Sequence, residues 1–198
     1  GKTTALFVIR MDAPDQALVR QGLGAQAEVL ARCHDRIIGV LREGDFVTRL
    51  DGTAFAVVLS PVRRLDLETC IQLSARMQSA IAEPISVDAL RLHVSASIGF
   101  CLGQRAPKAH GAALFDCADV AAYEADRHGP SAIRAWDASM TRRRADRETL
   151  SDELDHGLTD GQIRAHFQPQ LSTDTGEISG FEALARWYHP KRGLIAPA

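Results

Sequence analysis

The stretch of sequence that decides the fold is residues 42–55, which read Arg-Glu-Gly-Asp-Phe-Val-Thr-Arg-Leu-Asp-Gly-Thr-Ala-Phe. Apolar residues run into the dipeptide Asp51-Gly52 and out of it again as far as Leu59. An Asp-Gly dipeptide between two alternating apolar runs is among the strongest short signals for a β-hairpin. We therefore predict two strands, over residues 46–50 and 54–60, joined by a tight turn.

The remaining periodicities predict an α/β domain around this hairpin. A helix interrupted near Gly22 is expected from apolar positions between residues 18 and 41. Apolar spacing predicts the other elements: a first strand over 6–10, helices over 67–81 and 111–127, a second hairpin with strands over 85–87 and 90–102, and a short strand over 132–136. Together they indicate a mainly antiparallel central sheet flanked by helices.

Residues 51–55 resemble the signature of GGDEF domains, the diguanylate cyclases that join two GTP molecules into cyclic di-GMP. Gly52 and Phe55 match that signature, whereas Asp51, Thr53 and Ala54 depart from it. The resemblance implies an acidic metal ligand at the third position and a glutamate at the fourth. Phosphoryl transfer needs anionic oxygens that hold divalent cations against the phosphates, and a hydroxyl and a methyl group do not supply that charge. We therefore expect a degenerate active site without cyclase activity.

Other positions implied by the resemblance point the same way. Asp12 falls where the family has its first metal-binding aspartate, so one vestigial ligand is expected there. Arg20 and Gln21 stand where active members have the Asn and Asp that hold guanine. Asp126 replaces a lysine that meets the triphosphate. An acid in that place repels phosphate, whereas a lysine attracts it.

Arg42 and Asp45 match the spacing of the family's inhibitory site, where cyclic di-GMP binds away from the active site. A guanidinium suits a phosphate or a guanine edge, and a carboxylate can accept hydrogen bonds from guanine. The residues alone also fit a helix end followed by a polar turn at Gly44. Both interpretations stay open at this stage, and GTP in what remains of the active cleft is a second candidate ligand.

A second recognisable segment lies at the other end of the chain. Residues 167–170 read Phe-Gln-Pro-Gln and residues 181–187 read Phe-Glu-Ala-Leu-Ala-Arg-Trp, which resembles the opening of EAL domains. These are cyclic di-GMP phosphodiesterases with a TIM-barrel-like fold. The resemblance implies that Glu182 binds Mg²⁺ or Mn²⁺ in a complete domain and that Gln168 and Arg186 contact the substrate there. Because such a barrel needs about 200 residues or more, we expect this segment to be inactive by itself and to hold no tightly bound metal.

The predicted organisation is a degenerate GGDEF domain over 1–137, a charged linker helix over 138–160 and the beginning of an EAL domain over 161–198. We interpret the chain as a piece of a longer protein. The linker has leucines one turn apart, at Leu150, Leu154 and Leu158. A spacer is the simplest role for such a helix, and pairing in a homodimer and transmission of movement are the alternatives.

Composition and charge indicate which classes of partner and which cellular compartment to expect. A formal net charge of −2 argues against a nucleic-acid surface. No apolar stretch approaches the ~20 residues of a membrane span. The four cysteines are far apart and lie in apolar patterns, which favours buried free thiols in a reducing cytoplasm.

Two functional hypotheses follow from these observations. In the first, an inactive GGDEF-type domain senses cyclic di-GMP or GTP and modulates an attached EAL phosphodiesterase. In the second, the domain binds no nucleotide and serves as a structural or dimerisation scaffold for the EAL domain. A ligand titration discriminates between them, because a specific ligand stabilises the protein that binds it.

Overall fold

The computed structural model describes residues 1–12, 16–87 and 90–196, the side chains of residues 16–21 and 90 excepted. The chain forms two compact units, Gly1–Arg142 and Arg143–Ala198. They are called the first and the second unit below.

The centre of the first unit is a five-stranded sheet with the strand order β2-β3-β1-β6-β7. All neighbouring strands are antiparallel except β6 and β7, which confirms the predicted mainly antiparallel sheet. The strands are β1 (Ala5–Met11), β2 (Phe46–Arg49), β3 (Ala54–Val58), β6 (Ala96–Leu102) and β7 (Ile133–Ala135).

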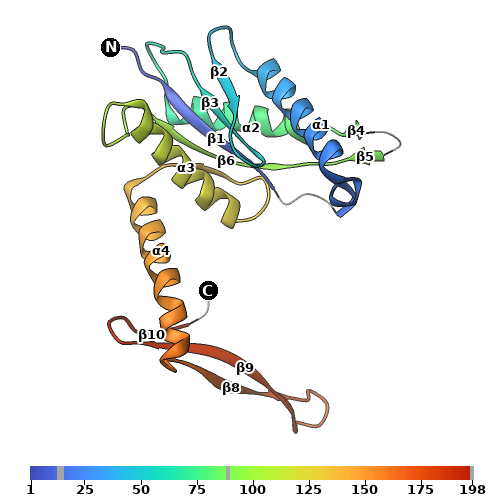
Figure 1. Cartoon of the computed structure of the whole chain (residues 1–198), viewed down its shortest axis with the longest axis vertical. Coiled ribbons are helices and arrows are strands. Elements are labelled where there is room, and N and C mark those ends of the chain that lie inside the picture. Colours follow the sequence, from blue (N-terminus) through green and yellow to red (C-terminus); the bar gives the residue numbers. More distant parts are fainter. Residues whose placement is uncertain (13–15, 88–89, 197–198) are drawn as a thin grey trace. The chain divides into compact units, whose positions relative to one another are not determined.

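Helices cover both faces of this sheet (Figure 1). On one face lie α1 (Gln16–Val40) and α2 (Leu67–Ala82), and on the other lies α3 (Gly111–Arg127). Side chains alternate across a strand, so Phe7 and Ile9 of β1 belong to the core with α1 and α2, whereas Leu6 and Val8 belong to the core with α3. The predicted interruption of the first helix is confirmed at Gly22, whose φ is 82°.

The second predicted hairpin is wrong in one respect. Its strands β4 (Ile85–Val87) and β5 (Leu90–Leu92) form a separate two-stranded sheet, and β6 begins only at Ala96. Leu92, Ala96 and Ile98 all belong to the same core cluster, so the apolar alternation continues across the break and does not reveal it. The chain changes its partner at Ser95, whose carbonyl accepts a 2.9 Å hydrogen bond from the Asp12 amide.

Side chains cap both ends of α2. At its beginning the Asp66 carboxylate accepts a 2.8 Å hydrogen bond from the Thr69 amide. At its end the Arg36 guanidinium of α1 donates to the carbonyls of Ile81 at 3.1 Å and Pro84 at 2.9 Å. Both ends of a helix have unpaired backbone groups, and these contacts satisfy some of them.

We expect the stabilising effect of Asp66 to depend on pH. Hydrogen bonding to Thr69 lowers the pKa of the Asp66 carboxyl below its ordinary value, so the folded state favours the charged form. The contribution to stability is therefore present above the pKa of the unfolded chain, about 3.9. It is lost as the pH falls through the lower pKa of the folded state.

Thermal unfolding of Asp66→Ala measures this effect. The gap between its midpoint and that of the wild type is expected to be largest at neutral pH and to shrink toward about pH 2. Asp66→Ser is the control, because a serine hydroxyl caps a helix without titrating. A gap of constant size over this pH range would contradict the prediction.

The second unit begins within α4 (Ala138–Thr159) and contains a three-stranded sheet in the order β10-β9-β8. A helix was predicted close to this range. The strands β8 (Ile163–Leu171), β9 (Ile178–His189) and β10 (Gly193–Ile195) pair in antiparallel fashion.

All four cysteines are free and buried, as predicted. Burial raises the pKa of the Cys33 and Cys70 thiols to about 11 and the pKa of the Cys101 thiol to about 12. These three thiols are therefore neutral at physiological pH, and a neutral thiol is a poor nucleophile. Among the described helices, none is both long enough and apolar enough to cross a bilayer.

Candidate functional site

The signature turn, residues 51–55, joins β2 to β3 beside the end of β1. The Met11 amide donates a 3.1 Å hydrogen bond to the Thr53 carbonyl, which ties the turn to the last residue of β1. Gly52 has a φ of 72°, a conformation that glycine adopts readily. Phe55 is fully buried and belongs to the core beneath α1 and α2. The hairpin thus has the architecture that the sequence predicts, whatever its chemistry.

An arginine lies next to the fourth signature position. The strand register places Arg10 of β1 opposite Ala54 of β3 and opposite Ser97 of β6. Arg10 is on the face of the sheet that α3 covers, and its guanidinium forms a 2.5 Å ion pair with Asp119 of α3. Its Nε atom is buried and has no hydrogen-bond partner among the residues that the structure describes. The side chain beside the signature turn is therefore a cation.

The predicted vestigial metal ligand, Asp12, lies in a different network. One of its carboxylate oxygens accepts a 2.7 Å hydrogen bond from the Ser97 hydroxyl. The other accepts from the Ser95 hydroxyl and, at 3.0 Å, from the Ser131 amide. The carboxylate thus joins the end of β1 to the beginning of β6 and to the segment after α3.

A divalent cation does not fit these residues. Mg²⁺ and similar hard cations need several oxygen ligands, usually with carboxylates among them. Thr53 and Ala54 provide no carboxylate, the carboxylate of Asp12 accepts hydrogen bonds from three donors, and that of Asp119 pairs with Arg10. A guanidinium beside a cation adds repulsion. Within the described parts of the chain, no group of three or more His, Cys, Asp or Glu side chains could hold a metal ion.

The other implied departures from the GGDEF pattern are less informative here. The side chains of Arg20 and Gln21 lie outside the described residues. Asp126 is exposed on the last turns of α3. Its role opposite a triphosphate stays a prediction.

Arg42 and Asp45 lie in the turn after α1, and their side chains differ sharply in exposure. The Asp45 side chain is 1% exposed and the Arg42 side chain 57%. One Asp45 oxygen accepts a 2.8 Å hydrogen bond from the Ser60 amide, and the other accepts a 3.1 Å bond from the Arg42 amide. Gly44 between them has a φ of 88°. The Arg42 Nε atom also lies 3.4 Å from the Asp45 carboxylate. This geometry supports the polar-turn interpretation for Asp45 and leaves most of the Arg42 side chain in solvent.

The implied EAL residues come together on one face of the second unit's sheet. Gln168 of β8 lies directly opposite Glu182 of β9, and Arg164 lies opposite Arg186. Since alternate residues share a face of a strand, Gln168, Glu182 and Arg186 share one face. The opposite face is apolar and includes Phe167 and Phe181, which are 67% and 62% exposed.

Sequence reasoning identified this trio but missed Arg10. The signal was a single charged residue inside the otherwise apolar run of residues 5–11. A charge within a buried strand requires a partner or a site. Here that partner is Asp119 of α3.

Comparison with known proteins agrees with this architecture. Residues 2–132 match the family described as diguanylate cyclase, GGDEF domain, and residues 151–198 match the EAL domain family. A signaling protein of Caulobacter vibrioides is 29% identical over 201 residues, which cover 100% of this chain and 24% of that protein. The cyclic di-GMP phosphodiesterase NbdA of Pseudomonas aeruginosa is also 29% identical over 201 residues, covering 100% of this chain and 25% of NbdA.

A solved structure gives the same result for the first unit. The GGDEF domain of YfiN from Pseudomonas aeruginosa has 29% sequence identity and a TM-score of 0.66, and the match covers 73% of this chain and 83% of that one. The chain spans about a quarter of the length of the two curated relatives. The chain therefore belongs to the GGDEF domain family and continues into the beginning of an EAL domain.

Proposed function

We propose that the first unit is a catalytically inactive GGDEF domain that regulates a cyclic di-GMP signalling protein. The observation that carries this proposal is the ion pair between Arg10 and Asp119 beside a signature turn with Thr53 and Ala54. A diguanylate cyclase must hold divalent cations against the triphosphate. A guanidinium in this place opposes that requirement.

The regulated activity in this proposal is that of the EAL domain. In a complete domain Glu182 would bind Mg²⁺ or Mn²⁺, while Gln168 and Arg186 would contact cyclic di-GMP. Their common face on β8 and β9 supports this assignment. The phosphodiesterase activity named for NbdA, which aligns with the whole of this chain, supports the same substrate class. The free buried thiols suit a reducing compartment, so we place the domain in the cytoplasm.

The proposed regulatory ligand is GTP in the degenerate cleft or cyclic di-GMP at Arg42 and Asp45. Regulation requires a ligand that binds two states of the protein with different affinities. The buried Asp45 carboxylate already accepts two backbone hydrogen bonds, which weighs against guanine recognition there. Beside the signature turn, the guanidinium of Arg10 could meet a phosphate, because its side chain is 34% exposed.

The alternative function is a nucleotide-free scaffold that positions or dimerises the EAL domain. A specific observation favours it as well. The carboxylates of Asp12 and Asp45, which the family resemblance associates with ligands, both accept hydrogen bonds from within the domain. Carboxylates that are already hydrogen-bonded within the domain do not require a nucleotide as a partner.

Calorimetric titration of this chain with GTP and with cyclic di-GMP, each with and without Mg²⁺, tests the proposal. We expect GTP to bind without Mg²⁺ and no cyclic di-GMP to form from it. Arg42→Ala is expected to leave GTP binding unchanged, and Arg64→Ala, which removes another exposed arginine, is the matched control. Formation of cyclic di-GMP would overturn the proposal of an inactive domain. The absence of binding with both nucleotides would favour the scaffold.

A further inference from the structure

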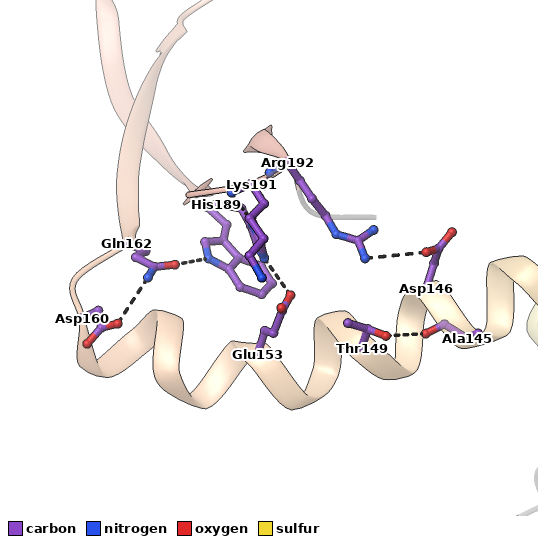
Figure 2. Close-up of polar contacts among 10 residues, drawn as sticks. Ala145, Asp146, Thr149, Glu153, Asp160, Gln162, His189, Lys191 and Arg192 are labelled. Carbon is purple, nitrogen blue, oxygen red and sulfur yellow. Dashed lines mark hydrogen bonds and ion pairs between the residues drawn. The ribbon is translucent and has the colours of Figure 1, made fainter.

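Within the second unit, one face of α4 is fixed to the turn between β9 and β10 (Figure 2). The Glu153 carboxylate lies 2.8 Å from the Nε2 atom of His189, and the Asp146 carboxylate lies 3.6 Å from the Arg192 guanidinium. An alanine Cβ at Gly157 would lie only 2.8 Å from the indole nitrogen of Trp187. Residues 146, 153 and 157 are seven and four positions apart, so they share one helix face.

His189 is the centre of this contact. Its side chain is 3% exposed. The Nδ1 atom accepts hydrogen bonds from the amides of Lys191 at 3.1 Å and Arg192 at 3.3 Å. Because Nδ1 is an acceptor, the Nε2 atom carries the hydrogen that is donated to Glu153. The imidazole therefore links the side of the helix to the backbone of the turn.

Trp187 provides a second link from the same face of β9. Its indole nitrogen donates a 3.0 Å hydrogen bond to the Gln162 side chain, and its ring centroid lies 5.0 Å from that of His189. Gln162 directly precedes β8, and its backbone amide donates a 2.9 Å hydrogen bond to the Gly157 carbonyl near the end of α4. The end of β9, the start of β8 and the last turns of α4 thus form one packed cluster.

We propose that His189 is a positioning residue that makes α4, from Arg143 onward, and strand β9 move as one body. Side chains alternate along a strand. Trp187 and His189 therefore hold β9 from the helix side, while Glu182 and Arg186 lie on the other face. When the helix moves, the face of β9 that contains Glu182 and Arg186 therefore moves with it. The coupling between α4 and β9 is inferred from these contacts alone. Only the use of this coupling in regulation rests on the proposed function.

This proposal changes the interpretation of residues 143–159. In this proposal they are part of the EAL hairpin's own fold, which favours transmission of movement over the spacer role for the linker helix predicted over 138–160. The helix begins at Ala138, and Met140 belongs to the core that α3 covers. The same helix therefore contributes to both units.

Hydrogen exchange of the 198-residue chain, followed by mass spectrometry without any ligand, tests the coupling. Removing a hydrogen bond to a charged group typically weakens local stability enough to speed exchange about tenfold or more. We expect Glu153→Ala to speed exchange in peptides that cover the second half of β9 by about this factor. Glu153→Gln retains an acceptor oxygen for His189 and is expected to restore most of the protection.

Asp152→Ala is the matched control, since Asp152 is the exposed neighbour of Glu153 on the same helix. The amides of this variant are expected to exchange at the wild-type rate. The proposal would be overturned if the β9 amides of Glu153→Ala exchanged at the wild-type rate. It would also be overturned if Asp152→Ala sped exchange in β9 as much as Glu153→Ala does. An equal increase in the far half of β8 would also overturn it, because this would indicate general loosening of the hairpin. Since no nucleotide is present, failure here is independent of the ligand titration above.

Discussion

Replacing Gly99 with alanine is expected to lower the stability of the first unit more than any other alanine substitution proposed for it. A Cβ atom at this position of β6 would lie 1.8 Å from the Ala122 nitrogen and 2.3 Å from the Ala121 carbonyl carbon, both in the backbone of α3. A change of side-chain rotamer cannot relieve a clash with a helix backbone. Either α3 or the sheet must shift, and both belong to the same core.

The expected loss is about 4 kcal/mol or more, a large part of the ~5–15 kcal/mol that stabilises a typical domain. Urea unfolding followed by circular dichroism measures it. Gly39→Ala in α1 is the control, because a Cβ there meets nothing within 4 Å. Alanine at an exposed helix position usually gains about 0.5–1 kcal/mol over glycine. Equal midpoints for the two variants would contradict the packing of α3 on β6.

Asp45→Ala is expected to lower the stability of the first unit by about 2–3 kcal/mol. The Asp45 side chain is 1% exposed, and its removal takes the acceptor from the amides of Arg42 and Ser60. Asp45→Asn retains one acceptor oxygen and should lose about half as much. Arg42→Ala removes a mostly exposed side chain, and we expect it to cost below about 1 kcal/mol.

Parallel urea unfolding of the three variants and calorimetry with cyclic di-GMP distinguish a structural carboxylate from a ligand-binding one. If Asp45 serves the turn, stability falls in the order given above. If Asp45→Ala is as stable as the wild type and only its affinity for cyclic di-GMP changes, the turn interpretation is wrong.

Local signals were sufficient for most of the fold. The Asp51-Gly52 dipeptide fixed the hairpin, and the helix over 111–127 was predicted with the bounds that α3 has. The break between β5 and β6 could not be predicted, because Leu92, Val94 and Ala96 keep the alternation of a single strand. Which partner a strand pairs with is decided by tertiary contacts, here those of Asp12 with Ser95 and Ser97.

The candidate site shows the same limit. The spacing of Arg42 and Asp45 was visible in the sequence, but the burial of the carboxylate depends on Ser60, fifteen residues later. Arg10 was overlooked because its importance comes from the register with Ala54 and from Asp119, more than one hundred residues away. Sequence spacing gives the residues of a site, whereas the direction of their side chains follows from packing.

The ion pair between Arg10 and Asp119 has a consequence for the mutational paths open to this domain. Thr53→Asp alone would restore one carboxylate but leave the guanidinium of Arg10 opposite Ala54, where its charge opposes a metal ion. Arg10→Asp alone would put two carboxylates side by side, and their repulsion would weaken the fold. Each single step toward a metal site thus meets a penalty that only a coordinated change in β1, the hairpin and α3 removes.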